Sequence, residues 1–131
     1  MSKPVILCVD DEVAVLESLE IELQQAFKGK YVCEFAESAA EALDIIAELC
    51  EDEVNILVIV SDWLMPGMKG DELLIKIHQK YPQIVKVMVT GQADQAAIER
   101  TKTQANLHAF IQKPWKNHEL IEAIKSGLTK L

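Results

Sequence analysis

Short runs of mainly apolar residues recur five times along the chain. Each is followed by a longer segment with apolar residues every three or four positions. A short run without polar alternation is typical of a strand that is buried on both faces. A spacing of three to four residues is typical of a helix that buries one side. The alternation therefore predicts an α/β protein of five strand–helix units, with a parallel sheet covered by helices on both faces.

The boundaries of these elements follow from the same periodicities and from local stop signals. The predicted strands cover residues 5–9, 31–35, 56–60, 85–89 and 109–111, and the predicted helices cover residues 12–27, 39–50, 70–81, 94–104 and 117–130. Ser38 opens a capping box with the glutamate three residues later, which marks a helix start. The fourth helix has a thin apolar face, made of Ala96, Ala97 and Ile98. Weak burial predicts that this helix is a mobile element.

The composition bounds the class of protein. A length of 131 residues fits one domain, and 50% apolar residues are enough for a core. No apolar run approaches the roughly 20 residues that cross a bilayer, and the run at 5–9 is too short for a signal peptide. Three cysteines without CxxC spacing argue against a disulfide framework or a zinc site. We therefore expect a cytoplasmic protein without a membrane partner.

The net charge of −8 argues against direct binding to nucleic acid, because the phosphate backbone would be repelled. The charge is uneven: residues 1–66 hold 15 acids and 3 bases, whereas residues 67–131 hold 6 acids and 10 bases. Solvation of exposed faces is the simpler interpretation of this asymmetry. The alternative is that the second half presents a less acidic surface to a partner.

Polar side chains stand at the ends of four of the predicted strands. In chain order they are Asp10 and Asp11, then Asp62, then Thr90, then Lys113. Taken singly, each has an ordinary explanation as a helix cap, a turn residue or a surface charge. Together they are informative, because the carboxyl ends of parallel strands meet at one edge of the sheet, where ligands bind.

Three carboxylates at one edge would repel each other unless a cation lies between them. Mg²⁺ suits such a site because it prefers hard oxygen ligands and uses few carboxylates. Lys113 and Thr90 add a positive charge and a hydroxyl donor for phosphoryl oxygens. A carboxylate nucleophile, a metal and donors for the phosphoryl oxygens are the components of phosphoryl transfer to a carboxylate side chain.

Four segments carry a family resemblance. They are Val9-Asp10-Asp11-Glu12, Asp62-Trp63-Leu64-Met65-Pro66-Gly67-Met68-Lys69-Gly70, Val89-Thr90-Gly91 and Phe110-Ile111-Gln112-Lys113-Pro114. They resemble the receiver domain of two-component response regulators, and the resemblance extends from Pro4 to the last helix. It implies a flavodoxin-like, doubly wound parallel sheet with strand order 2-1-3-4-5. It also implies that residues 1–131 form a single receiver domain, without an output domain in this chain.

The resemblance implies a role for each site residue. Asp62 would accept a phosphoryl group from a phosphohistidine on a sensor histidine kinase or a phosphotransfer protein. Asp11 and Asp62 would bind Mg²⁺ directly with the backbone carbonyl of Leu64, and Asp10 would act through a metal-bound water. Lys113 would pair with Asp62 and then with the phosphate.

The resemblance also implies how the signal leaves the site. Thr90 would move to hydrogen-bond the phosphate, and Phe110 would turn inward with it. Pro114 would follow a cis peptide bond that aims Lys113 into the site. The changed surface would be the fourth helix, fifth strand and fifth helix, read by a downstream effector or a fused output domain, with phosphorylation-dependent dimerisation as a further possibility. Such a protein catalyses only its own phosphorylation and dephosphorylation.

Departures from the family pattern concern access to Asp62 and the lifetime of its phosphoryl group. Gly91 stands where alanine is common in the family, which would open the acceptor to its donor. Leu64 and Gln92 occupy positions that tune dephosphorylation, and the apolar Leu64 cannot orient an attacking water. We therefore expect a long-lived phosphoryl group. Trp63, beside the acceptor, is expected to be a partly exposed ring.

Three other functions were weighed. A phosphatase of the haloacid-dehalogenase type needs a second aspartate two residues after the nucleophile, where this chain has Leu64. A nucleotide- or flavin-binding module lacks support, because no GxGxxG or GxxxxGK[ST] motif is present. A degenerate receiver that serves only for docking would not need the complete set of site residues. Whether the chain is a stand-alone regulator or a fragment stays open.

Overall fold

The computed structural model describes residues 3–92 and 94–131. Strands and helices alternate along the described chain. They are β1 (Val5–Val9), α1 (Val13–Phe27), β2 (Val32–Ala36), α2 (Ala39–Glu51), β3 (Ile56–Ser61), α3 (Gly70–Lys80), β4 (Val85–Thr90), α4 (Gln95–Ala105), β5 (Ala109–Gln112) and α5 (Asn117–Leu128). All ten predicted elements are present, and their ends lie within one or two residues of the predicted ones.

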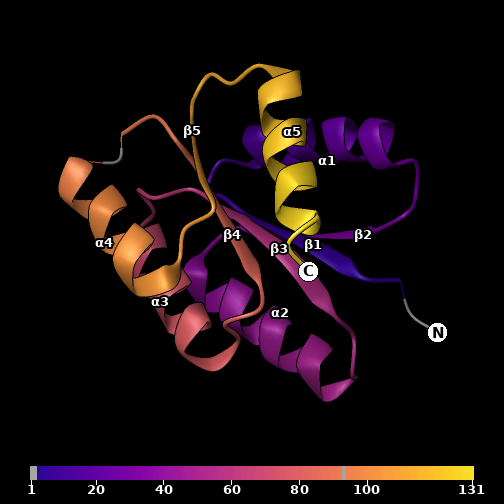
Figure 1. Cartoon of the computed structure of the whole chain (residues 1–131), viewed down its shortest axis with the longest axis horizontal. Helices are drawn as coiled ribbons and strands as arrows, with labels where there is room; N and C mark the ends of the chain where they lie inside the picture. The colour runs from indigo at the N-terminus through magenta and orange to yellow at the C-terminus, as the bar shows by residue number, and fades with distance from the viewer. Residues whose placement is uncertain (1–2, 93) are drawn as a thin grey trace.

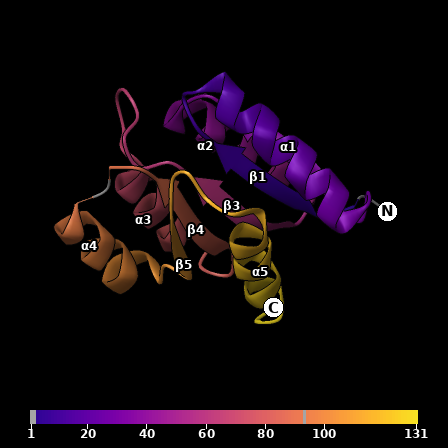
Figure 2. The same ribbon diagram turned by 90° about the horizontal axis from the view of Figure 1, so that it is seen from above.

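The five strands form one parallel sheet in the order β2-β1-β3-β4-β5, which confirms the predicted fold class. Helices α1 and α5 cover one face, and α2, α3 and α4 cover the other (Figures 1 and 2). Along the chain, β2 joins one side of β1, whereas β3, β4 and β5 are added on its other side. In open sheets of this kind the carboxyl ends of those two strands form the ligand-binding crevice.

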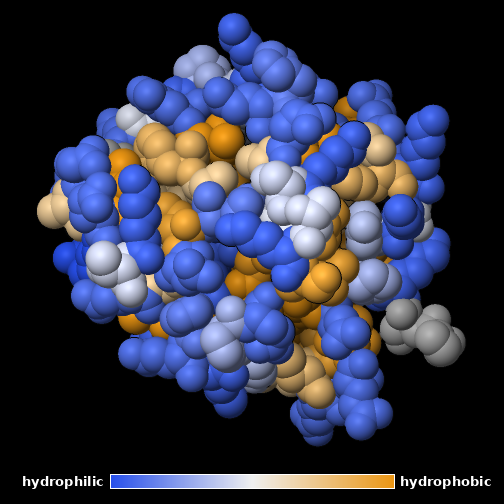
Figure 3. All heavy atoms as spheres, in the orientation of Figure 1, coloured by the Kyte–Doolittle hydropathy of each residue, from blue (hydrophilic) through white to orange (hydrophobic). Residues whose placement is uncertain are grey.

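The core lies on both faces of the sheet, and β1 shows how one short strand serves both. Val5, Leu7 and Val9 belong to the cluster under α2, α3 and α4, whereas Ile6 and Cys8 belong to the cluster under α1 and α5. Side chains alternate across a strand, so a strand buried on both sides needs an unbroken apolar run. On the face seen in Figure 3, mostly polar side chains cover the surface, with apolar ones between them.

Local signals fix the helix ends. The Ser38 hydroxyl oxygen accepts a hydrogen bond of 3.1 Å from the backbone N–H of Glu41, as the capping box predicts. Helix α1 ends where Lys28 takes a left-handed conformation with φ of 49°, and Gly29 follows with φ of 78°. None of the helices in the described ranges is long and apolar enough to cross a membrane.

Helix α4 buries a wider face than predicted. Ala97, Ile98, Thr101 and Ala105 are buried, whereas the predicted core residue Ala96 is exposed. Thr101 fits this apolar interface because its hydroxyl donates to the Ala97 carbonyl at 2.7 Å, within the helix.

A lysine is buried in the sheet. Lys86 on β4 is only 1% exposed, and its Nζ lies 2.7 Å from His78 Nδ1 and donates to the Pro82 carbonyl at 3.2 Å. Burial lowers the pKa of Lys86 to about 8, because the charged form loses its hydration. Burial and the nearby Lys86 charge also lower the pKa of His78. The protein therefore holds an ammonium group where an apolar side chain would be more stable.

We predict that Lys86→Met raises the free energy of unfolding at pH 7 by about 1–2 kcal/mol. The folded pKa is lower than the unfolded value of about 10.4, so the penalty is fully present below pH 8 and is relieved as pH rises from 8 to about 10.4. Urea unfolding at pH 7 and pH 9.5 should show the advantage of the methionine variant shrinking. Lys76→Met, on the exposed side of α3, is the control and should show no such pH dependence; an equal response of both variants would contradict the prediction.

Candidate functional site

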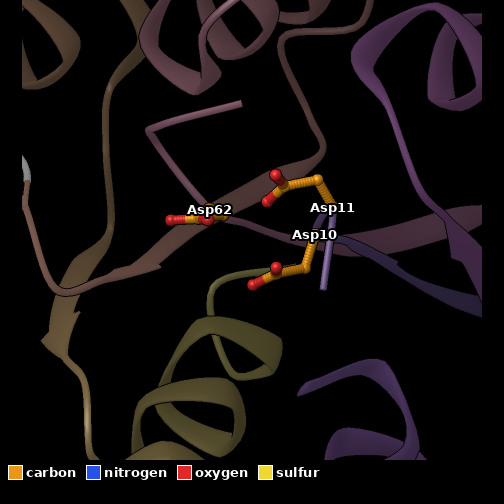
Figure 4. A group of neighbouring side chains, drawn as sticks. All are labelled: Asp10, Asp11 and Asp62. Carbon is orange, nitrogen blue, oxygen red and sulfur yellow. The ribbon is translucent and has the colours of Figure 1, made fainter. Parts of the chain in front are cut away.

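Three carboxylates meet at the crevice between β1 and β3. Asp10 and Asp11 follow β1, Asp62 follows β3, and one oxygen of each lies within 4.8 Å of the others. The three carboxylates point the same way, beyond the ends of β1 and β3 (Figure 4). Asp10 and Asp62 are only 2% and 5% exposed, whereas Asp11 faces solvent. The sequence prediction that strand ends bring these residues together is confirmed.

Backbone groups orient two of the carboxylates. The β ladder continues past the strand ends, because the Asp62 N–H donates to the Val9 carbonyl at 2.9 Å. The backbone N–H of Trp63 then donates to Asp62 Oδ1 at 2.8 Å, and that of Glu12 donates to Asp10 Oδ1 at 2.8 Å. Each buried carboxylate thus has one oxygen fixed by the following turn, which leaves Oδ2 for other partners.

Lys113 supplies a positive charge to the other oxygens. Its Nζ donates to Asp10 Oδ2 at 2.7 Å, and lies 3.5 Å from Asp62 Oδ2 and 3.7 Å from Glu12 Oε1. The peptide bond between Lys113 and Pro114 is cis, as expected. The expected pairing with Asp62 is present, but Asp10 is the nearer partner.

The pKa values of Asp10 and Lys113, the two groups closest to each other, reflect this crowding. Burial raises the pKa of Asp10, and the Asp62 charge raises it further, although the hydrogen bonds from Lys113 and from the Glu12 N–H oppose both. Burial lowers the pKa of Lys113, but the hydrogen bond to Asp10 and the surrounding carboxylates outweigh it and hold the value above normal. The lysine therefore stays charged among the carboxylates at neutral pH.

An open pocket of about 580 Å³ lies over the cluster. Its lining includes Asp11, Asp62, Leu64, Thr90 and Lys113, and also Glu12, Met65, Pro66, Gly91 and Gln92. Leu64 is 44% exposed at the rim. A Cβ added at Gly91 would have its nearest neighbour at 3.9 Å, the Cβ of Lys113, so alanine would fit there. The missing methyl group leaves the approach to Asp62 wider.

The predicted switch residues lie on the two strands beside the site. Thr90 ends β4, is 2% exposed, and its Oγ1 accepts from the Gln92 N–H at 3.4 Å. Phe110 on β5 pairs in register with Met88 of β4 and is partly buried against the core under α3 and α4. Phe110 is absent from the pocket lining.

The expectation of a partly exposed Trp63 is wrong. The ring is 8% exposed, because its Nε1 donates to Asp71 Oδ1 at 3.1 Å, and Lys69 Nζ lies 5.0 Å from the ring centre. Asp71 also pairs with Arg100 of α4. Sequence reasoning missed both partners. The available signal was an acidic residue in the buried stripe of α3, where Asp71 shares a face with Leu74.

Comparison with known proteins points to one family. The model of the response regulator receiver domain matches residues 6–125. Sensor kinase CckA of Brucella abortus is 35% identical over 125 residues, which is 95% of this chain and 12% of that protein. Hydrogenase transcriptional regulatory protein HoxA of Cupriavidus necator is 28% identical over 123 residues, which is 94% of this chain and 24% of that protein. The chain thus spans a quarter or less of these curated relatives.

A solved structure has the same fold. The response regulator receiver domain protein (CheY-like) from Methanospirillum hungatei JF-1 superimposes with a TM-score of 0.85 and is 34% identical. The match covers 98% of this chain and 96% of that one. The similarity therefore includes all five strand–helix units.

We predict that Gly70→Ala destabilises the fold by about 2 kcal/mol or more, whereas Gly91→Ala is nearly neutral. A Cβ at Gly70 would lie 2.0 Å from the Asp62 carbonyl oxygen, so backbone must move. The added methyl at Gly91 meets no atom closer than 3.9 Å. Urea unfolding of both variants measures the difference. Equal stability of the two variants would contradict the close contact between Gly70 and the Asp62 backbone.

Proposed function

Because the chain belongs to the family of response regulator receiver domains, we propose that it is a phosphorylatable switch with Asp62 as the phosphoryl acceptor. The observation that supports this most is the cluster of three carboxylates with Lys113 at the ends of β1 and β3. As a receiver domain the chain is a signalling switch and not a conventional enzyme. The chemistry that we assign is limited to gain and loss of its own phosphoryl group.

The donor set fits Mg²⁺. The carboxylates of Asp10, Asp11 and Asp62 offer hard oxygen atoms in one open pocket, whose lining includes Leu64. We assign Asp11, Asp62 and the Leu64 carbonyl as direct ligands, and Asp10 as a ligand through water. Bound Mg²⁺ would neutralise the carboxylates and the incoming phosphoryl oxygens.

The residues of this chain carry out the transfer as follows. A carboxylate oxygen of Asp62 attacks phosphorus and forms an O–P bond. The N–P bond of the donor phosphohistidine breaks, and its electron pair returns to the imidazole nitrogen. Lys113, 3.5 Å from Asp62 Oδ2, is placed to pair with a phosphoryl oxygen on that side. The buried hydroxyl of Thr90 turns from the Gln92 N–H to a second oxygen.

The response follows from the added charge. A phosphoryl group adds about −1.5 to −2 charges, which recruit Thr90 and Lys113. We propose that Phe110 fills the space left by Thr90 and that the surface of α4, β5 and α5 changes with it. Residues 1–131 act in this scheme as one receiver unit. A histidine kinase or phosphotransfer protein supplies the phosphoryl group, and an effector, a fused output domain or a second copy reads the surface.

The first test is phosphorylation by a small donor. Incubation with phosphoramidate and Mg²⁺ should add one phosphoryl group to the intact mass, and hydroxylamine should remove it because the product is an acyl phosphate. Asp62→Asn and an EDTA-treated sample are the controls and should show no adduct. An adduct that persists in Asp62→Asn would place the acceptor elsewhere, and no adduct on the wild type would overturn the proposed switch.

The lifetime of the phosphoryl group is a second prediction. The exposed Leu64 side chain lines the pocket and has no group that could orient an attacking water. We expect the phosphorylated protein to last for minutes or longer, and Leu64→Asn to shorten this several-fold by adding a hydrogen-bonding side chain. Intact mass at intervals after donor removal gives both rates. A wild-type half-life of seconds would contradict the assignment to Leu64.

A further inference from the structure

A chain of polar contacts runs from Asp62 to helix α4. The Trp63 N–H donates to Asp62 Oδ1 at 2.8 Å, and the Trp63 indole N–H donates to Asp71 Oδ1 at 3.1 Å. The guanidinium of Arg100 donates to Asp71 Oδ2. Arg100 belongs to α4 and Asp71 to the first turn of α3, and the two helices lie side by side in Figures 1 and 2. The path thus joins the acceptor to a neighbouring helix through one tryptophan.

The buried carboxylate of Asp71 depends on the exposed guanidinium of Arg100. Asp71 has 1% of its side chain exposed, and a carboxylate so deeply buried needs charged or polar partners for both oxygens. Its two oxygens are used by Trp63 and Arg100. The Arg100 side chain is 47% exposed. Removal of Arg100 would leave an unpaired negative charge under the acceptor, whereas removal of Asp71 would leave a cation that water can solvate.

The tryptophan cannot move independently of α3. The Gly70 N–H donates to the Trp63 carbonyl at 2.8 Å and closes the loop between them. Gly70 also packs against the Asp62 backbone so closely that any Cβ would overlap the carbonyl oxygen. Acceptor, tryptophan and the first turn of α3 therefore form one packed unit, and Arg100 ties that unit to α4.

We propose that Asp71 and Arg100 are positioning residues for phosphorylation: they hold Trp63 so that its backbone N–H fixes Asp62 Oδ1 and presents Oδ2 beside Lys113. The inference rests on the proposed function and adds a second connection between the acceptor and α4. This connection is separate from Thr90 and Phe110, which lie on β4 and β5. Through these contacts the packing of α4 against α3 influences the position of Asp62 Oδ2, and with it the rate at which Asp62 reacts.

The test compares two variants on the same helix. Arg100→Gln should lower the rate constant of phosphorylation by phosphoramidate roughly 3- to 10-fold, which lies within the range for residues that couple sites without touching the ligand. Lys102→Gln removes an exposed cation that lies 3.6 Å from Glu99 on α4 itself, and should leave the rate unchanged. Arg100→Lys should restore most of the rate, because it keeps a cation within reach of Asp71.

Two further readouts separate positioning from loss of fold. All rates are measured where urea unfolding shows each variant to be fully folded, since a purely structural role would lower stability without changing the rate. Asp71→Asn combined with Arg100→Gln should be no slower than the slower single variant, because residues that act as one unit are non-additive. Additive losses would show that the two residues act independently.

The outcomes distinguish the two proposals. A wild-type protein without an adduct overturns the proposed function and this inference with it. A wild-type adduct with equal rates in Arg100→Gln and Lys102→Gln leaves the proposed function intact and overturns the inference alone. A selective loss in Arg100→Gln, rescued by Arg100→Lys, establishes the positioning role.

Discussion

The mutual repulsion of Asp10, Asp11 and Asp62 is the constraint on which the site depends. Their oxygens lie within 4.8 Å of one another, and two of the three side chains are almost fully buried. In this low-dielectric setting such a cluster is tolerated only with positive charge beside it. Lys113 supplies that charge from a loop that follows the last strand, 103 residues from Asp10. The two ends of the sequence are thus held together at the crevice by electrostatics as well as by packing.

Backbone contacts fix the spacing of the three carboxylates. The ladder that joins Asp62 to Val9 continues beyond the strands, so the acidic residues of β1 and β3 meet at a fixed spacing. The glycine at position 70 brings the start of α3 against the Asp62 carbonyl, where a larger residue would not fit. Site and fold are consequently coupled: the contacts that close the sheet edge are also the contacts that orient the acceptor.

The sequence predicts those features that depend on local pattern. Unbroken apolar runs such as Val5–Val9 predict strands buried on both faces, and their carboxyl ends locate the site. Long-range pairings leave no such signal. The acidic residue in the buried stripe of α3 indicates that Asp71 needs partners, but neither helix pattern identifies Arg100, 29 residues away, or Trp63 as those partners. The preference of Lys113 for Asp10, at 2.7 Å against 3.5 Å for Asp62, likewise depends on side-chain placement that the sequence does not encode locally.

Within residues 3–92 and 94–131, the sheet separates two apolar cores that have no buried side chain in common. One cluster includes the buried residues of α1 and α5, and the other includes those of α2, α3 and α4. The contacts from Trp63 through Asp71 to Arg100 lie entirely with the second. A partner that bound the molecule on α1 would leave the α3–α4 layer free to repack. Under the proposed function, delivery of the phosphoryl group beside α1 and a rearrangement of α4 on the other face would not compete for the same surface.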